Sequence, residues 1–267
     1  MAWKPRQQEV FQMKLQSYAT ARRVFSLLIL VYVPVATVSG QSADPLIDKY
    51  LKARGGYEKL KAIKTLRMTG TYQEGKSSFG TYIEWKRPSF RVVVVGIPNE
   101  VYREGYNGTS WEFSAPSGEL KITQPSSAAG MAARRGAEFD ESIIDYRQKG
   151  HRVELVGQEG LNGKDVYHLR VTLSDGWVKD YYLDAETYLI VALRKAMPLH
   201  AAGPAIESLS TYEDYRPVAG VLFPHAFVER NTATGAVMNT LRWDLIEANI
   251  KIDDNQFNPP TITKPVH

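Results

Sequence analysis

The first regular pattern of apolar residues along the chain has the period of a helix. Leu46, Ile47 and Tyr50 recur at the spacing that places side chains on one helical face. A proline in the first turn of this stretch and a pair of glycines after it are typical helix start and stop signals. We therefore expect a helix over 44–54, followed by a second short helix over 57–63.

From residue 65 onward the period of the apolar positions changes from 3.6 to 2, which is the period of a strand. Turn-forming Gly, Pro, Asn and Asp residues separate the apolar runs, and connections this short join antiparallel neighbours. The predicted strands are 65–73, 77–87, 89–97, 99–106, 109–114, 152–159, 164–173, 177–183, 189–196, 205–215, 221–230 and 236–249.

The stretch 115–136 interrupts the alternation, because it is rich in Pro, Ser, Ala and Gly. A further helix is predicted over 137–149, with Ile143 among its apolar residues. Glu141 and Asp145 lie one turn apart on that helix, close to basic residues, and we expect them to form a solvated face.

These elements predict the α+β class, with one large antiparallel sheet of about 11 to 12 strands and two or three helices. An open sheet of that size has to curl. Two or three helices are too few to cover both faces of such a sheet. We therefore expect a strongly curved sheet with the helices packed over its concave side.

Two of the predicted strands, 90–97 and 177–183, carry apolar residues on both faces, which a sheet covered on one side does not require. One face of these strands holds Phe90, Val92 and Val94, and Trp177, Tyr181 and Leu183; the other holds Val93 and Val95, and Val178 and Tyr182. Two further strands alternate more simply, and their apolar residues are expected to point inward: Tyr167, Leu169, Val171 and Leu173, and Val237, Leu241, Trp243 and Leu245.

Apolar residues on both faces have two explanations, and both stay open at this point. Either helices lie beneath the sheet and a neighbour above it, or the concave face forms a pocket for an apolar ligand. The side chains expected to line such a ligand-binding cavity are Trp85, Phe90, Val92, Trp111, Tyr167, Leu169, Tyr181, Leu241 and Trp243.

The N-terminal stretch has the pattern of a secretory signal. Two arginines precede the uncharged 15-residue run 24–38, which is shorter than the ~18–20 residues of a spanning helix and contains Pro34. Small residues follow, so we expect residues 1–40 to be a signal peptide cleaved after Gly40. A start at Met13 would give a leader of ordinary length, and residues 1–12 would then be a start-site artefact. An uncleaved anchor and a buried helix are the alternatives.

The charge of the chain is concentrated in this leader. Five of the 33 basic residues and one of the 29 acidic residues lie in residues 1–40, which leaves residues 41–267 without net charge. Such a balance lacks the basic footprint of nucleic-acid binding. The chain contains no cysteine, which excludes thiol catalysis, cysteine zinc sites and a lipidated N-terminal cysteine.

No catalytic motif stands out in the sequence. It contains no HExxH, GxSxG, Walker A or GxGxxG pattern. His168 alternates with apolar residues in a strand and is expected to be an outward-facing or hydrogen-bonded sheet residue rather than a ligand. The acidic run 253–255 is expected to be a turn. We therefore expect no catalytic residues, no metal site and no cofactor.

Four separate segments, spread in order over about residues 44–260, carry a resemblance to a known family. They are Tyr50–Gly56 with Lys59, Leu60, Ile63–Leu66 and Gly70; Gly163 and Tyr167–Leu169 with Lys179–Asp184 and Thr187; Asp214–Arg216 with Gly220–Pro224; and Glu247–Asp254 with Phe257 and Pro259. Together they resemble the LolA/LolB-like superfamily of outer-membrane lipoprotein-sorting proteins. The resemblance implies a curved half-barrel closed by helices, around a hydrophobic cavity that shields acyl chains from the aqueous periplasm.

The expected function follows from this resemblance. We expect residues 41–267 to form a single LolA-like domain, periplasmic or secreted, that binds lipid or lipoprotein acyl chains without being an enzyme and carries them to the outer membrane. The expected partners are a lipid or an acylated protein and an envelope protein, and the chain is expected to be a monomer. A sensor or regulatory protein-binding module on the same fold and a hydrolase with scattered acids are the alternatives.

Overall fold

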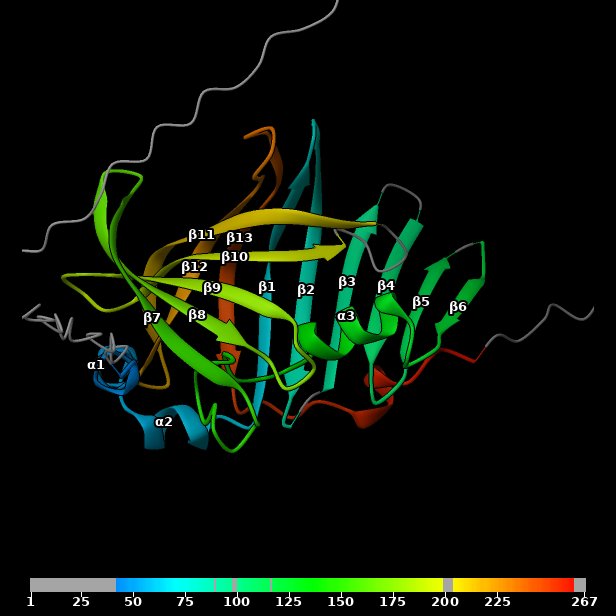
Figure 1. Cartoon of the computed structure of the whole chain (residues 1–267). Coiled ribbons are helices and arrows are strands. Elements are labelled where there is room, and N and C mark those ends of the chain that lie inside the picture. Colours follow the sequence, from blue (N-terminus) through cyan, green and yellow to red (C-terminus); the bar gives the residue numbers. More distant parts are fainter. Residues whose placement is uncertain (1–41, 89, 98–99, 116, 199–203, 262–267) are drawn as a thin grey trace, which may run out of the picture. The chain divides into compact units, whose positions relative to one another are not determined.

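The structure is a computed structural model that describes residues 42–261, apart from residues 89, 98–99, 116 and 199–203. The predicted leader, residues 1–40, and its cleavage site lie outside the described residues. Thirteen strands of the described part form one antiparallel sheet (Figure 1). They are β1 (Thr65–Glu74), β2 (Ser77–Lys86), β3 (Phe90–Ile97), β4 (Glu100–Tyr106), β5 (Ser110–Ala115), β6 (Glu119–Thr123), β7 (Arg152–Leu161), β8 (Lys164–Thr172), β9 (Val178–Asp184), β10 (Ile190–Pro198), β11 (Ala205–Val218), β12 (Val221–Asn231) and β13 (Val237–Ala248).

The order of the strands divides the sheet into two arms. It runs β6-β5-β4-β3-β2-β1-β13-β12-β11-β10-β9-β8-β7. The chain therefore enters the sheet in the middle at β1, reaches one edge at β6, crosses to the opposite edge at β7 and returns to the middle at β13. We call β1 to β6 one arm of the sheet and β7 to β13 the other. The crossing carries α3 (Ala128–Gly136), while α1 (Asp44–Arg54) and α2 (Tyr57–Ala62) precede the sheet and a short 3-10 helix, η1 (Asp254–Phe257), follows it.

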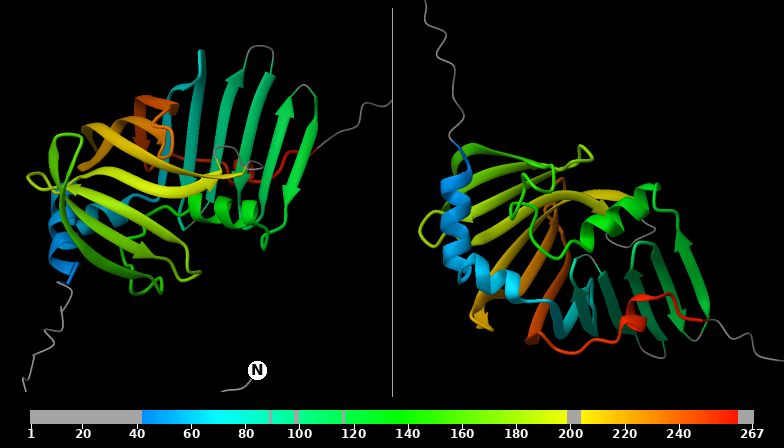
Figure 2. Two further views of the ribbon diagram at one scale, coloured as in Figure 1. Left: turned by 45° about the horizontal axis from the view of Figure 1, so that its top comes forward. Right: turned by 90° about the horizontal axis from the view of Figure 1, so that it is seen from below.

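The position of α3 demonstrates the curvature of the sheet. This helix contacts β4 and β5 of one arm and β10 of the other, although six strands separate β4 from β10 in the sheet. A nine-residue helix reaches both arms only because the sheet bends around it, and Figure 2 shows α3 lying between them. The predicted curved antiparallel half-barrel with covering helices is confirmed.

Helix α1 covers the arm that contains β7 to β12. Its buried face includes Leu46 and Tyr50, which belong to the same hydrophobic core as Leu169 and Leu183. Gly55 ends the helix in the left-handed region, with φ 118°, and a Cβ there would lie 2.2 Å from a backbone oxygen of the β11–β12 turn. Glycine is therefore required at this helix end, as the sequence pattern indicates.

A second hydrophobic cluster lies on the face of β3 opposite the main core. Val92 and Val94 pack there with Trp111, Ile252 and Phe257. The Trp111 Nε1 atom donates a hydrogen bond of 2.9 Å to the backbone oxygen of Phe257. The segment after the last strand thus covers this face, and of the two explanations left open for strand 90–97 the structure shows a covering neighbour on this side.

The predicted helix over 137–149 is wrong, because the structure places the third helix directly before it. Ser127 caps α3 by accepting a hydrogen bond of 3.0 Å from the backbone N–H of Gly130, and residues 137–150 form turns instead. Ile143 is fully buried, as expected for an apolar helix face, but in a non-helical segment. β6 was also missed within the same Ala/Gly/Ser-rich stretch.

Glu141 and Asp145 were expected on a solvated face, and this expectation is also wrong. Glu141 pairs with Arg54 at 2.5 Å, and Asp145 pairs with Lys61 at 2.8 Å. These ion pairs tie the turn segment to α1 and α2. They hold the backbone in a shape that a helix would not reach, including a left-handed Asp145 with φ 53°.

A bulge in β13 reverses one predicted face. Thr69 pairs with Leu245, whereas the next residue, Gly70, pairs with Trp243, so Asp244 is an extra residue in the ladder. Leu245 therefore points outward and is 52% exposed, while Ile246 is buried. A second irregularity between β12 and β13 leaves Val237 exposed in the same way.

Candidate functional site

The concave side of the sheet contains a cavity of about 730 Å³. Its wall is contributed by β1 to β5, by β9 to β13, and by α3 with the residues that follow it. Ligand pockets in proteins range from about 300 to 1,000 Å³, so this cavity is large enough to enclose most of a lipid-sized molecule.

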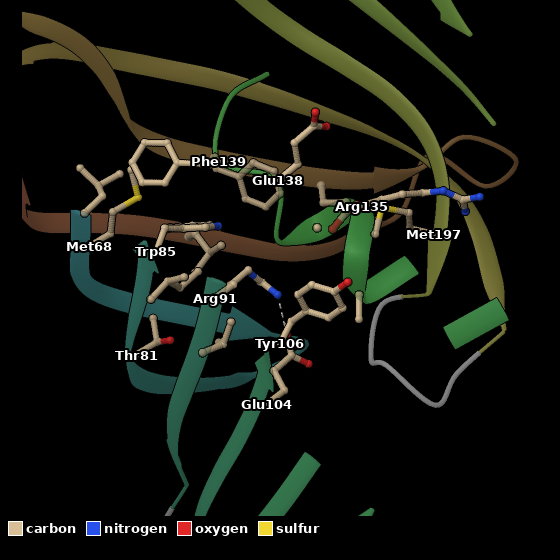
Figure 3. A pocket seen from close by; sticks show the side chains of 18 of the residues that line it. Met68, Thr81, Trp85, Arg91, Glu104, Tyr106, Arg135, Glu138, Phe139 and Met197 are labelled. Carbon is tan, nitrogen blue, oxygen red and sulfur yellow. Dashed lines mark hydrogen bonds and ion pairs between the residues drawn. The ribbon is translucent and has the colours of Figure 1, made fainter. Parts of the chain in front are cut away.

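Much of the wall is apolar. Figure 3 shows Met68, Trp85 and Phe139 gathered at one side of the pocket. Further apolar side chains around the cavity are Ile83, Val93, Val95, Leu193, Met197, Leu241 and Trp243. The two arms of the sheet thus face one another across an apolar space, and α3 with the residues that follow it lines the same space.

Charged side chains also line the cavity, and most of them form ion pairs. On the β3–β4 side, an Nη atom of Arg91 lies 3.0 Å from the Glu104 carboxylate (Figure 3). On the β10–β13 side, Lys195 lies 3.6 Å from Glu229, which also accepts hydrogen bonds from Ser208 and Asn239. Burial disfavours the charge on Glu229, but Lys195 and these donors outweigh it and hold its pKa below the usual range.

A buried arginine connects α1 to the turn segment 137–150 that follows α3. Arg54 is only 4% exposed and donates hydrogen bonds of 2.5 Å both to Glu141 and to the Tyr50 hydroxyl. Burial raises the cost of the Glu141 charge, yet the adjacent guanidinium holds its pKa below the usual value. Because Arg54 itself lines the cavity, this cluster forms part of the wall at the foot of α1.

His168 lies in β8, within the sheet as its alternation with apolar neighbours predicts, and it is buried. Its ring nitrogens lie 2.9 Å from Glu159 and 3.0 Å from Asp180, on strands to either side. Among the described residues, no three His, Asp or Glu side chains gather as a metal site would require. In the same part of the chain, no helix has both the length and the apolar character needed to cross a membrane.

Comparisons with solved structures find this architecture elsewhere. A putative outer membrane lipoprotein-sorting protein domain from Vibrio parahaemolyticus matches with a TM-score of 0.53 and 15% identity, over 79% of this chain and 96% of the other. A LolA superfamily protein from Nitrosomonas europaea matches with a TM-score of 0.53 and 13% identity, over 81% and 97%. The chain has a LolA-like fold.

A third solved structure supports the same assignment. It is a DUF1329 family protein from Desulfovibrio piger, with a TM-score of 0.56 and 12% identity, over 80% of this chain and 96% of that one. No protein-family model matches the sequence, and comparison with curated proteins finds no significant match. The likeness is therefore one of fold, as expected from the turns and strand ends that carry the sequence resemblance.

The nine residues predicted to line the cavity fall into three groups in this LolA-like structure. Trp85, Leu241 and Trp243 line the cavity. Phe90, Val92 and Trp111 belong to the cluster on the opposite face of β3, under the C-terminal segment. Tyr167, Leu169 and Tyr181 belong to the main core and are not among the residues that line the cavity. The sequence pattern thus identified apolar faces without distinguishing core from cavity.

The charged residues of the cavity were not anticipated. Lys179 has a visible signal in the sequence, because it lies on the same face of its strand as Trp177, Tyr181 and Leu183. A lysine within an inward-facing apolar series is unusual, since lysine is rarely buried without a partner. Arg91 carries a similar signal, because it lies on the same face of its strand as Val93 and Val95.

Proposed function

We propose that the protein is a periplasmic binding protein for the acyl chains of lipids or lipoproteins, and that it carries them toward the outer membrane. The observation that carries this proposal is the cavity of about 730 Å³ with its apolar wall on the concave face of a LolA-like sheet. An apolar cavity that excludes water stabilises a bound chain by ~0.8 kcal/mol for each methylene group it buries.

Binding rather than catalysis is the role that the wall supports. The charged side chains Arg91 and Glu104, and likewise Lys195 and Glu229, neutralise one another in pairs. Such pairs hold the wall in place and lower the cost of burying charge, whereas a catalytic cleft concentrates groups that converge on one point.

The location and organisation are part of the same proposal. The leader-like residues 1–40 support export, and we propose that residues 41–267 act as one LolA-like domain after its removal. The likeness to a putative lipoprotein-sorting domain favours a lipid or an acylated protein as the cargo and an envelope protein as the recipient. We propose that the protein acts as a monomer.

The test is uptake of a neutral amphiphile by the protein expressed as the full chain and purified without detergent. Native mass spectrometry and isothermal calorimetry with monoacylglycerols of increasing chain length should give one bound molecule. The affinity should rise roughly fourfold for each added methylene until the cavity is full. Failure of the wild-type protein to bind any of them would contradict the proposal and favour the protein-binding alternative.

A matched pair of variants on β13 links binding to the cavity. Leu241 lines the cavity, whereas Leu245 on the same strand points outward and is 52% exposed. Leu241→Glu should abolish uptake, because it places a charge in the apolar wall, and Leu245→Glu should leave uptake unchanged. Equal binding by both folded variants would show that the ligand lies elsewhere.

A further inference from the structure

Two lysines stand directly opposite each other on the inner face of the sheet. Lys179 on β9 and Lys195 on β10 are cross-strand partners in the ladder, and both line the cavity. Side chains in such pairs lie about 5 Å apart at Cβ, and like charges in this arrangement repel. Lys179 is also 8% exposed, so water solvates its charge poorly.

The carboxylates around Lys179 are each engaged by another cation. Lys195 pairs with Glu229 at 3.6 Å, and Lys149 pairs with Glu138 at 2.7 Å. Arg135, on the α3 side of the cavity, pairs with Asp175 in the β8–β9 turn, at 2.8 Å. The Lys195–Glu229 and Lys149–Glu138 pairs are neutral as units, whereas Asp175 is shared between Arg135 and the more exposed Arg134, which lies 3.2 Å from it.

Lys179 has no equivalent partner. Its Nζ atom donates a hydrogen bond of 2.8 Å to the hydroxyl of Ser142, which in turn donates to Glu138 at 3.0 Å. Within the part of the chain that the structure describes, Lys179 forms no ion pair within 4 Å. The wall therefore carries one uncompensated positive charge at this position.

The energetics of the isolated charge agree with this geometry. Burial, together with the neighbouring cations Lys195, Lys149 and Arg135, lowers the pKa of Lys179 to about 8, although Glu138 acts in the opposite direction. The ammonium group is thus still protonated at neutral pH, in a place where it is poorly stabilised. An anion in the cavity would relieve this cost.

We propose that Lys179 binds the headgroup of the ligand at one end of the cavity. The ligand is an acyl amphiphile whose head carries a single negative charge, a carboxylate or a phosphodiester. The single charge matches the one ammonium group of Lys179, which lines the cavity and forms no ion pair within 4 Å among the described residues. Leu193 and Met197 lie two positions to either side of Lys195 and also line the cavity, so an apolar wall begins directly beside the site. This inference rests on the proposed acyl-chain binding.

The test compares ligands that share one chain and differ in the head. Myristate, a myristoyl lysophosphatidylglycerol, neutral monomyristoylglycerol, and acetate or inorganic phosphate alone are titrated into the full-length protein at pH 7. Both anionic amphiphiles should bind roughly tenfold or more tightly than the neutral one, as charge-assisted hydrogen bonds do relative to neutral ones. The small anions should bind far more weakly than either.

Lys179→Met is the decisive variant, because methionine keeps much of the side-chain length and removes the charge. It should bind all three amphiphiles with affinities within about twofold of one another, because the preference for anions depends on the removed charge. Lys251→Met is the matched control: this lysine is exposed after the last strand and does not line the cavity, so the preference for anions should persist.

The outcomes separate the two proposals. Equal binding of myristate and monomyristoylglycerol by the wild type, or a preference for anions that survives in Lys179→Met, would overturn the headgroup assignment while leaving acyl-chain binding intact. Acetate or phosphate binding as tightly as the amphiphiles would assign the site to a free anion instead. Failure of every amphiphile to bind would overturn both proposals.

Discussion

Removal of the buried charge at Lys179 should stabilise the ligand-free protein, which is the opposite of what most core substitutions do. The lysine is only 8% exposed, and burial and the neighbouring cations lower its pKa to about 8. Lys179→Met replaces it with an uncharged side chain that needs no partner. The loss of the hydrogen bond to Ser142 reduces the gain only partly, because that bond has an ordinary length of 2.8 Å and its acceptor is a neutral hydroxyl.

The magnitude and the sign follow from the two pKa values. In the unfolded chain the lysine titrates near its ordinary value of 10.5, so between about pH 8 and pH 10.5 the unfolded state binds more protons than the folded state. The wild type is therefore destabilised at neutral pH by up to about 3 kcal/mol, and its stability recovers as the pH rises through this window. Lys179→Met lacks this dependence, so its advantage should shrink by about 2 kcal/mol between pH 7 and pH 9.5.

The assay is the free energy of unfolding by urea, measured on the ligand-free proteins at both pH values, with Lys251→Met as the control for the loss of one exposed lysine. Taking the difference between variant and wild type removes the titration of all other groups that the substitution leaves unchanged. An advantage of Lys179→Met that stays constant with pH, or a variant less stable than the wild type at pH 7, would refute the conclusion that this lysine is an uncompensated buried cation.

Two further predictions concern the frame of the cavity. Gly105 faces Trp111 across the β4–β5 ladder, and a Cβ there would lie 2.2 Å from the indole ring, so Gly105→Ala should lose about 2 kcal/mol of stability in urea unfolding. Gly80→Ala, where the added atom meets nothing within 4 Å, should be nearly neutral, and equal losses in the two would refute the steric argument. Glu141→Leu leaves the Arg54 guanidinium buried without its carboxylate and should cost roughly 3 kcal/mol by the same assay; a cost below about 1 kcal/mol would mean that the pair contributes little.

Local sequence patterns predicted much of the fold. The helix at α1 follows from its apolar spacing and from Gly55, whose left-handed backbone only glycine adopts readily. Twelve of the thirteen strands follow from their period of two and from short turns, because these are properties of neighbouring residues. Alternation alone also separates Val92 from Val93 on strand 90–97, but it left open which of the two faces is concave.

The errors arose where a distant contact outweighed the local pattern. The residues of 137–149 have the spacing of a helix, but Glu141 pairs with Arg54, far away in the chain, and the segment folds into turns around such contacts. The extra residue at Asp244 turns Leu245 outward, and the alternation of apolar residues in β13 does not predict this bulge.

The candidate site shows the same division. The amino-acid sequence determined which side chains are apolar and which face of each strand they share, because both depend only on residue type and on the period of the backbone. Whether an inward face meets another layer, as Leu169 does, or an open cavity, as Trp243 does, depends on how far the two arms of the sheet bend apart. The opposition of Lys179 and Lys195 likewise depends on the register between β9 and β10. Curvature and register are set by all thirteen strands together, so only the tertiary structure decided where the cavity lies and where its charge is left uncompensated.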